Sequence, residues 1–222
     1  LAFYYQNNLT DVLFANGTLP TIKTNAFPLP SNNIDAFHYP NMSPDDVNTL
    51  QGFFLTGHVK SLSVTTFTYT DASTSTYDGS ILSSSCYYSG KTLQSISVGT
   101  VVSNILAGAF EGNSDLKEVT YPTENRFPGS AMTIGASAFK NCSSLKVAII
   151  PDGVTSIGEQ AYFGIEDLGY VIFFGKPIPT MSETNTFTVT KDKGTQAYYS
   201  QQLSEADIKT LQDIFGIVNV YK

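Results

Sequence analysis

Four carboxylates that lie close together are the side chains of this sequence with the clearest chemical potential. Glu111, Asp115, Glu118 and Glu124 fall within residues 111–124. Two carboxylates at a fixed separation can hydrolyse a glycosidic bond, and a cluster of carboxylates can bind calcium. Their spacing matches neither a catalytic pair nor a calcium loop, so we expect a solvated acidic edge.

The histidines and cysteines offer the remaining chance of a metal or nucleophilic site. His38 and His58 have no acidic or cysteine neighbour at metal-ligand spacing, so we expect surface or rim histidines and no metal site. Cys86 and Cys142 occupy different positions within their repeats, so we expect free, mostly buried thiols. The sequence contains no nucleophile elbow, phosphate loop or dinucleotide fingerprint. It therefore predicts no catalytic residue, no cofactor and no enzymatic activity.

The charge balance disfavours nucleic acid as a partner, and the apolar runs are too short for a membrane span. Lys and Arg number 12 against 19 Asp and Glu, which gives a formal net charge of −7. An acidic surface repels a phosphate backbone, so nucleic-acid binding is disfavoured. The longest aliphatic run, Val147–Ile150, is far shorter than the about 20 residues that a membrane-spanning helix needs. Because the chain starts at Leu1 without a leader, we expect any targeting segment to be removed or to lie outside it.

An internal repeat positions most of the apolar side chains. A constant offset of 23 superposes Ile134 on Ile157, Phe139 on Tyr162, Leu145 on Leu168, Ala148 on Val171 and Ile150 on Phe173. Earlier copies begin at Leu82 and Ile105. Each copy has a strand with one apolar side and no partner inside itself, so stacked copies should pair their strands in parallel, about 4.8 Å apart. We therefore expect Phe110, Phe139 and Tyr162 to lie in register in one column.

The motif Ile134-Gly-x-x-Ala-Phe-x-x-Cys-x-x-Leu resembles the BspA-type leucine-rich repeat, and the resemblance covers residues 80–175. It implies an α/β leucine-rich-repeat solenoid of mostly short parallel strands and turns, with two short cap-like helices. It also implies a secreted or cell-surface location. The cysteine position of the motif holds Gly90, Asn113 or Ile165 in other copies.

A longer duplication relates the two ends of the chain. The segment Ser43–Phe54 recurs as Ser204–Phe215 at an offset of 161, and both have an N-cap serine followed by apolar positions at helical spacing. In the resembled family such a helix closes a repeat array, so both segments resemble array ends, and we expect the chain to be a fragment of a longer protein. We predict four parts: the end of a first repeat block at residues 1–64 with a cap-like helix at 43–54, an irregular insertion or hinge at 65–80, the main array at 81–186, and a C-terminal cap at 187–222 with a helix at 204–215.

The outward strand positions carry the best candidate site. They change along the array from polar to apolar: Ser95 and Ser97, Glu118 and Thr120, Val147 and Ile149, Tyr170 and Ile172. Four adjacent apolar side chains on a solvated sheet form an unusual patch. Two interpretations remain open. Either the segment 187–222 covers this patch, or Val147, Ile149, Tyr170 and Ile172 form an open ligand-binding face.

The function that this resemblance favours is binding without catalysis. We expect an adhesin-like module that recognises a protein ligand on a host or neighbouring cell through an extended solenoid face. One alternative is carbohydrate binding, in which exposed Tyr170, Tyr198 and Tyr199 stack on sugars. Another is a passive spacer that holds a further domain away from the cell. Fold alone does not separate these functions.

Overall fold

The computed structural model describes ten segments of the chain. They are residues 11–14, 34–38, 42–54, 59–61, 63–122, 131–181, 185–188, 194–199, 203–216 and 220–222. The chain divides into two compact units: unit 1 comprises Leu1–Val64 and Thr123–Pro128, and unit 2 comprises Thr65–Pro122 and Gly129–Lys222.

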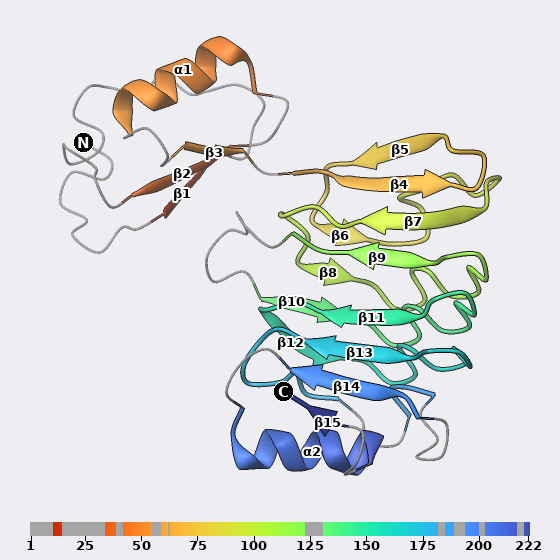
Figure 1. The fold of residues 1–222 in the computed structure, drawn as a ribbon. Coiled ribbons are helices and arrows are strands. Elements are labelled where there is room, and N and C mark those ends of the chain that lie inside the picture. The colour runs from red at the N-terminus through yellow and green to blue at the C-terminus, as the bar shows by residue number, and fades with distance from the viewer. Residues whose placement is uncertain are drawn as a thin grey trace. The chain divides into compact units, whose positions relative to one another are not determined.

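Unit 2 is a solenoid whose successive rungs place short, mostly parallel strands on two sides (Figure 1). One ladder contains β6 (Ile81–Leu82), β8 (Asn104–Ile105), β10 (Met132–Ile134) and β12 (Val154–Ile157). The other side contains the parallel pair β7 (Leu93–Ser97) and β9 (Glu118–Thr120), and the parallel sheet β11 (Val147–Ile150), β13 (Tyr170–Phe173), β14 (Gln196–Tyr199) and β15 (Val220–Tyr221). The predicted solenoid of short parallel strands is confirmed.

The core of unit 2 is a column of stacked aromatic rings. Neighbouring ring centroids lie 5.5 Å apart for Tyr87 and Phe110, 5.4 Å for Phe110 and Phe139, 5.1 Å for Phe139 and Tyr162, and 5.2 Å for Tyr162 and Phe187. The expected register of Phe110, Phe139 and Tyr162 is therefore confirmed. The column has this form because the repeat places one ring at the same point of every rung.

Two glycines allow the rungs to approach closely. A Cβ atom built on Gly158 would collide with the backbone nitrogen of Ala136, and one built on Gly135 would collide with that of Ala107. Because glycine has no Cβ atom, the backbones come close enough for hydrogen bonds between rungs. Gly158 N donates to Ile134 O at 2.7 Å, and Gly135 N donates to Ile105 O at 2.8 Å. The glycines are thus required by rung spacing.

Residues 65–80 are more regular than the sequence suggests. They contain an antiparallel hairpin of β4 (Thr65–Tyr69) and β5 (Thr74–Tyr77), and β4 also pairs antiparallel with β7. The Thr- and Tyr-rich composition suits a half-buried strand, and alternate residues of β4 are buried. The Phe67 ring lies 6.3 Å from Phe110 and covers the first rungs of the column. The division into repeat blocks remains a prediction.

The C-terminal end of unit 2 is closed by α2 (Glu205–Phe215). Its N-cap Ser204 accepts a hydrogen bond from Asp207 N at 3.1 Å, which satisfies one of the free amides of the first turn. The Phe215 ring lies 5.3 Å from Phe187, at the end of the column. The predicted helix at 204–215 is present, with Ser204 as its cap.

Unit 1 has a three-stranded parallel sheet and one helix. The strands are β1 (Asp11–Phe14), β2 (Asp35–His38) and β3 (Val59–Ser61), and the helix is α1 (Pro44–Phe53). Ser43 caps α1 by accepting from Asp46 N at 3.1 Å. The predicted helix at 43–54 therefore forms, and the described core of this unit consists of Phe14, Ile34, Ala36, Met42, Leu50 and Phe54.

Candidate ligand-binding face

The candidate site lies on the outward side of the sheet formed by β11, β13, β14 and β15. Its strands pair in parallel and in matched register, so outward side chains form rows that cross the strands. One row contains Val147, Tyr170 and Gln196, and the next contains Ile149, Ile172, Tyr198 and Tyr221. We define the apolar face as Val147, Ile149, Tyr170, Ile172, Tyr198 and Tyr221.

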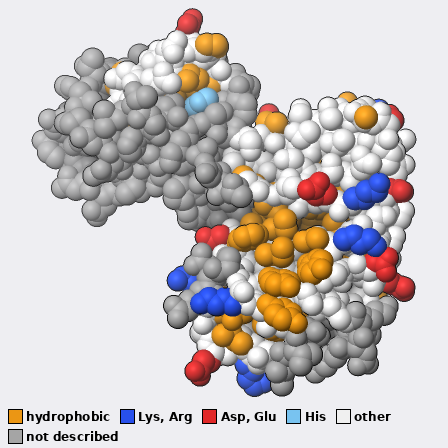
Figure 2. Space-filling model, viewed as in Figure 1, with side chains coloured by type: hydrophobic (Ala, Val, Ile, Leu, Met, Phe, Trp, Pro, Cys, Tyr) orange, Lys and Arg blue, Asp and Glu red, His pale blue; other side chains and the backbone are white. Residues whose placement is uncertain are grey.

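Alternation along each strand separates the apolar face from the core. In β13, Val171 and Phe173 are buried, whereas Tyr170 is 47% exposed and Ile172 is half-buried. Tyr221 on β15 is 39% exposed. Figure 2 shows hydrophobic side chains gathered in one band over β11, β13 and β14. The structure thus brings together all four residues that the repeat spacing predicted.

Tyrosines extend the apolar face beyond those four residues. The Tyr170 and Tyr198 ring centroids lie 6.1 Å apart with 48° between their planes, and Tyr198 stacks on Tyr221 at 5.2 Å and 23°. The Tyr198 hydroxyl donates to Gln196 Oε1 at 2.9 Å. Sequence reasoning missed Tyr221, because no repeat leucine precedes β15 and only parallel pairing with β14 places it there.

Tyr199 does not belong to this face. It pairs with Phe173 in the β13–β14 register and packs against the hydrophobic core. Tyr199 is partly buried and does not share a surface with Tyr170 and Tyr198, because successive side chains of a strand point to opposite sides of the sheet.

The described part of the segment 187–222 leaves this face open. That segment adds β14 and β15 to the sheet, and α2 lies at the end of the array (Figure 1). Phe215 packs on Phe173 and Phe187, which are core residues, and Tyr170 keeps 47% of its surface exposed. Among the described residues, the cap therefore covers the end of the column and not the apolar face.

Few charges border the apolar face. Lys146, which immediately precedes Val147, forms an exposed ion pair with Asp167 at 2.7 Å. Exposed pairs of this kind contribute little to stability. On the neighbouring strands β9 and β7 the outward positions are polar, with exposed Glu118 and Ser97. The apolar character of the sheet is thus confined to its C-terminal strands.

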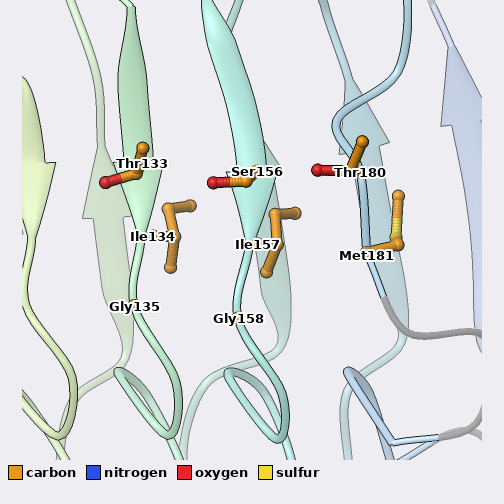
Figure 3. A pocket seen from close by; sticks show the side chains of 8 residues that line it. All are labelled: Thr133, Ile134, Gly135, Ser156, Ile157, Gly158, Thr180 and Met181. Carbon is orange, nitrogen blue, oxygen red and sulfur yellow. The ribbon is translucent and has the colours of Figure 1, made fainter.

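A shallow groove of about 520 Å³ lies on the other ladder, over β10 and β12 (Figure 3). The hydroxyls of Thr133 on β10, Ser156 on β12 and Thr180, which forms an isolated bridge with Ser156, point the same way. Thr133 donates to Asn104 Oδ1, and Thr180 donates to Thr155 O at 3.2 Å, so these hydroxyls link one rung to the next. None of the described residues that line the groove has a titratable side chain. We interpret the groove as a structural feature of the ladder.

The described carboxylates and the described histidine, His38, lie apart from one another along the fold. Glu111, Asp115 and Glu118 are exposed, as expected of a solvated edge. The prediction of a surface or rim position is wrong for His38, which is buried at the end of β2. Glu124 and His58 lie outside the described residues. Within the described segments, no group of three or more His, Cys, Asp or Glu side chains could hold a metal ion. No helix among the described residues is long and apolar enough to cross a membrane.

Both cysteines are free thiols. Cys142 is buried in the core and donates to Phe110 O at 3.1 Å, whereas Cys86 is partly exposed. Burial raises the pKa of the Cys142 thiol to about 12. A thiol that stays protonated is a poor nucleophile and metal ligand, so Cys142 is a packing residue.

Comparison with known proteins identifies the repeat. The family model described as "BspA type Leucine rich repeat region" matches in six copies, over residues 45–132 and 80–191. One solved structure, "The Crystal structure of Pneumococcal vaccine antigen PcpA", is 16% identical with a TM-score of 0.33 and covers 85% of this chain. This chain spans 52% of that structure's chain, which is about half of its length. No curated protein matches the sequence.

Proposed function

We propose that this chain, which belongs to the BspA-type leucine-rich repeat family, is a non-enzymatic, adhesin-like binding module of a secreted or cell-surface protein. Its ligand is a protein on a host or neighbouring cell. The apolar face on β11, β13, β14 and β15 binds that ligand, and its predicted contact residues are Val147, Ile149, Tyr170 and Ile172.

The observation that supports this proposal is the exposure of contiguous apolar side chains on a regular sheet. A sheet that only holds the solenoid together needs one apolar side, which the ring column already uses. A second apolar side costs solubility, and large exposed patches of this kind mark interaction sites. Aromatic side chains are also enriched at the buried centres of protein interfaces.

The ring geometry favours a protein ligand over a carbohydrate. A sugar stacks on the open face of an aromatic ring, but Tyr198 and Tyr221 already stack on each other at 5.2 Å. The Tyr198 hydroxyl is also engaged, by Gln196. This stack covers one face of each ring, and the exposed parts of the rings lie beside the aliphatic side chains of Ile149 and Ile172. Such a surface suits apolar side chains of a protein.

The test is binding of the full chain to a panel of purified extracellular-matrix and cell-surface proteins, measured by surface plasmon resonance. The variant Tyr170→Ala/Ile172→Ser removes the two central anchors. Loss of interface anchors typically costs about 2 kcal/mol or more, so we expect affinity for the true ligand to fall by about 30-fold or more. Circular dichroism should show an unchanged fold.

The matched control is Ser95→Ala/Ser97→Ala, which changes outward positions of β7 on the polar part of the same side. This variant should bind like the wild type. If the two variants bind every protein of the panel with equal affinity, the proposal that the apolar face binds the ligand is contradicted. Binding to a glycan array but to no protein would instead favour the carbohydrate alternative, and binding to neither would favour a spacer.

A further inference from the structure

The core of unit 1 repeats the core of the C-terminal end of unit 2. Each of its six buried residues has a buried counterpart, at an offset of 159 for the first pair and 161 for the other five. The pairs are Phe14 and Phe173, Ile34 and Thr195, Ala36 and Ala197, Met42 and Leu203, Leu50 and Leu211, and Phe54 and Phe215. The sequence duplication is therefore also a duplication of the packing.

The strand register is the same in both copies. Val12 pairs with Ala36 and Ala36 with Val59 in unit 1. In unit 2, Val171 pairs with Ala197 and Ala197 with Val220. Because one residue of slip would exchange the two sides of a strand, this agreement means that the same side of each strand faces its helix.

The helices also pack in the same way. In both copies a phenylalanine at the helix end meets a strand phenylalanine edge to face: Phe14 and Phe54 at 6.4 Å and 73°, Phe173 and Phe215 at 6.4 Å and 71°. Both helices have a serine cap that accepts from a backbone amide of the first turn at 3.1 Å. Unit 1 thus contains the same closing module that ends the array of unit 2.

The two copies differ at one strand edge. In unit 2, β13 pairs on its other side with β11, the last full rung of the array. In unit 1, β1 is the end strand of the described three-stranded sheet. Within the described sheet, this edge of β1 corresponds to the edge of β13 that pairs with β11, and such a parallel edge offers backbone groups to a further strand.

We propose that residues 9–61 are an array-closing module interchangeable with residues 168–222, and that the β1 edge docks the last rung of a leucine-rich-repeat array in the same polypeptide. The rung would pair in parallel with β1 as β11 pairs with β13, and its ring would extend the core beside Phe14. We assign the rung to the same polypeptide because in unit 2 the paired strands β11 and β13 belong to consecutive rungs of one chain, joined through β12. This proposal is independent of the ligand-binding face.

A chimera tests the interchange. Residues 168–222 of the full chain are replaced by a second copy of residues 9–64, so that Leu9 follows Asp167 as Leu168 does in the wild type. We expect a thermal transition of unit 2 within about 4 °C of the wild type, since a closing module that fits should cost no more than about 1 kcal/mol. The truncated chain 1–167 serves as the control and should bind a hydrophobic dye and melt broadly. A chimera that behaves like this truncation overturns the proposal.

A second measurement leaves the C-terminal end intact. Residues 81–167 are fused directly ahead of Leu9 in residues 9–222, and hydrogen exchange of β1 is compared with that of the wild type. Pairing of β1 with the added rung should slow its exchange by tenfold or more, and unchanged exchange overturns the proposal. Sedimentation of the wild-type chain tests whether a second copy of the chain, and not a rung of the same polypeptide, pairs with the β1 edge. If the chain is a dimer that the fusion converts to a monomer, a second copy occupies the edge and the proposal is overturned.

Discussion

The rings of Phe139 and Tyr162 stack with their centroids 5.1 Å apart and 17° between their planes, although the two residues belong to successive copies of the repeat. Both side chains are buried, and the stack continues to Phe110 on one side and Phe187 on the other. Each ring therefore contributes to the interface of two rungs. The stability of unit 2 should depend on these rings more than on its turns.

Removal of one ring from the middle of the column should destabilise the protein severely. Phe139→Ala leaves a cavity between two rungs, and a buried Phe→Ala change costs about 3–5 kcal/mol. Urea unfolding followed by circular dichroism measures this loss. Phe163→Ala is the matched control, because that ring is 38% exposed, and it should cost less than about 1 kcal/mol. Equal losses in the two variants would contradict the column as the main source of stability.

A single methyl group at a rung contact should also be costly. Gly158→Ala places a Cβ atom against the backbone nitrogen of Ala136, so the rungs must separate or the backbone must shift. Overpacking of this kind costs about 1–3 kcal/mol. Gly90→Ala is the control, since nothing lies within 4 Å of its Cβ position. Thermal unfolding should lower the melting temperature only for Gly158→Ala.

The two thiols should differ in reactivity. Cys142 is buried and burial raises the pKa of its thiol to about 12, so almost no thiolate forms near neutral pH. A thiol reagent at mildly alkaline pH should label Cys86 in the folded chain and leave Cys142 unlabelled until denaturant is added. The Cys86→Ser variant should therefore show no fast labelling. Rapid labelling of this variant under native conditions would disprove the burial of Cys142.

The sign of the pH effect follows from the same thiol. Its folded-state pKa of about 12 is above the ordinary value of 9.0 for a cysteine. The difference in thiol pKa therefore makes its full contribution to the free energy of unfolding below pH 9. This contribution is lost as the pH rises from 9 to 12. Stability measured across this window should fall less in Cys142→Ala than in the wild type.

The cap of α2 should contribute a small, separable amount of stability. Ser204→Ala removes the acceptor for Asp207 N and should cost about 1 kcal/mol, whereas Ser204→Gly should cost only a few tenths of that. Denaturant unfolding of the two variants provides the comparison. If Ser204→Gly is as damaging as Ser204→Ala, the hydroxyl has a role besides capping.

Apolar spacing was enough to predict the column. The apolar residues of a strand determine which of its sides is buried, and the regular offset repeats the same apolar positions in every rung. The same reasoning located Val147, Ile149, Tyr170 and Ile172 on one outward surface, because strand alternation is local. The two helices were predicted for a local reason as well, since a serine cap and apolar residues at helical spacing lie within one short segment.

Contacts between distant segments were outside the reach of these local rules. The hairpin at 65–77 depends on the antiparallel pairing of β4 with β7, and its Thr- and Ser-rich sequence fits a loop equally well. Tyr221 joins the apolar face only through pairing with β14. Phe187 joins the ring column although its offset from Tyr162 is longer than the offset between Phe139 and Tyr162.

The sequence by itself determined the repeating unit, the aromatic column and the two capped helices, because all three depend on side-chain type at short, regular spacing. The tertiary structure alone decided that α2 closes the end of the column and that the described residues leave the apolar face open. It also decided that unit 1 reproduces the closing packing in the same register. These outcomes depend on which surfaces meet across long stretches of chain, where burial elsewhere competes for the same apolar side chains.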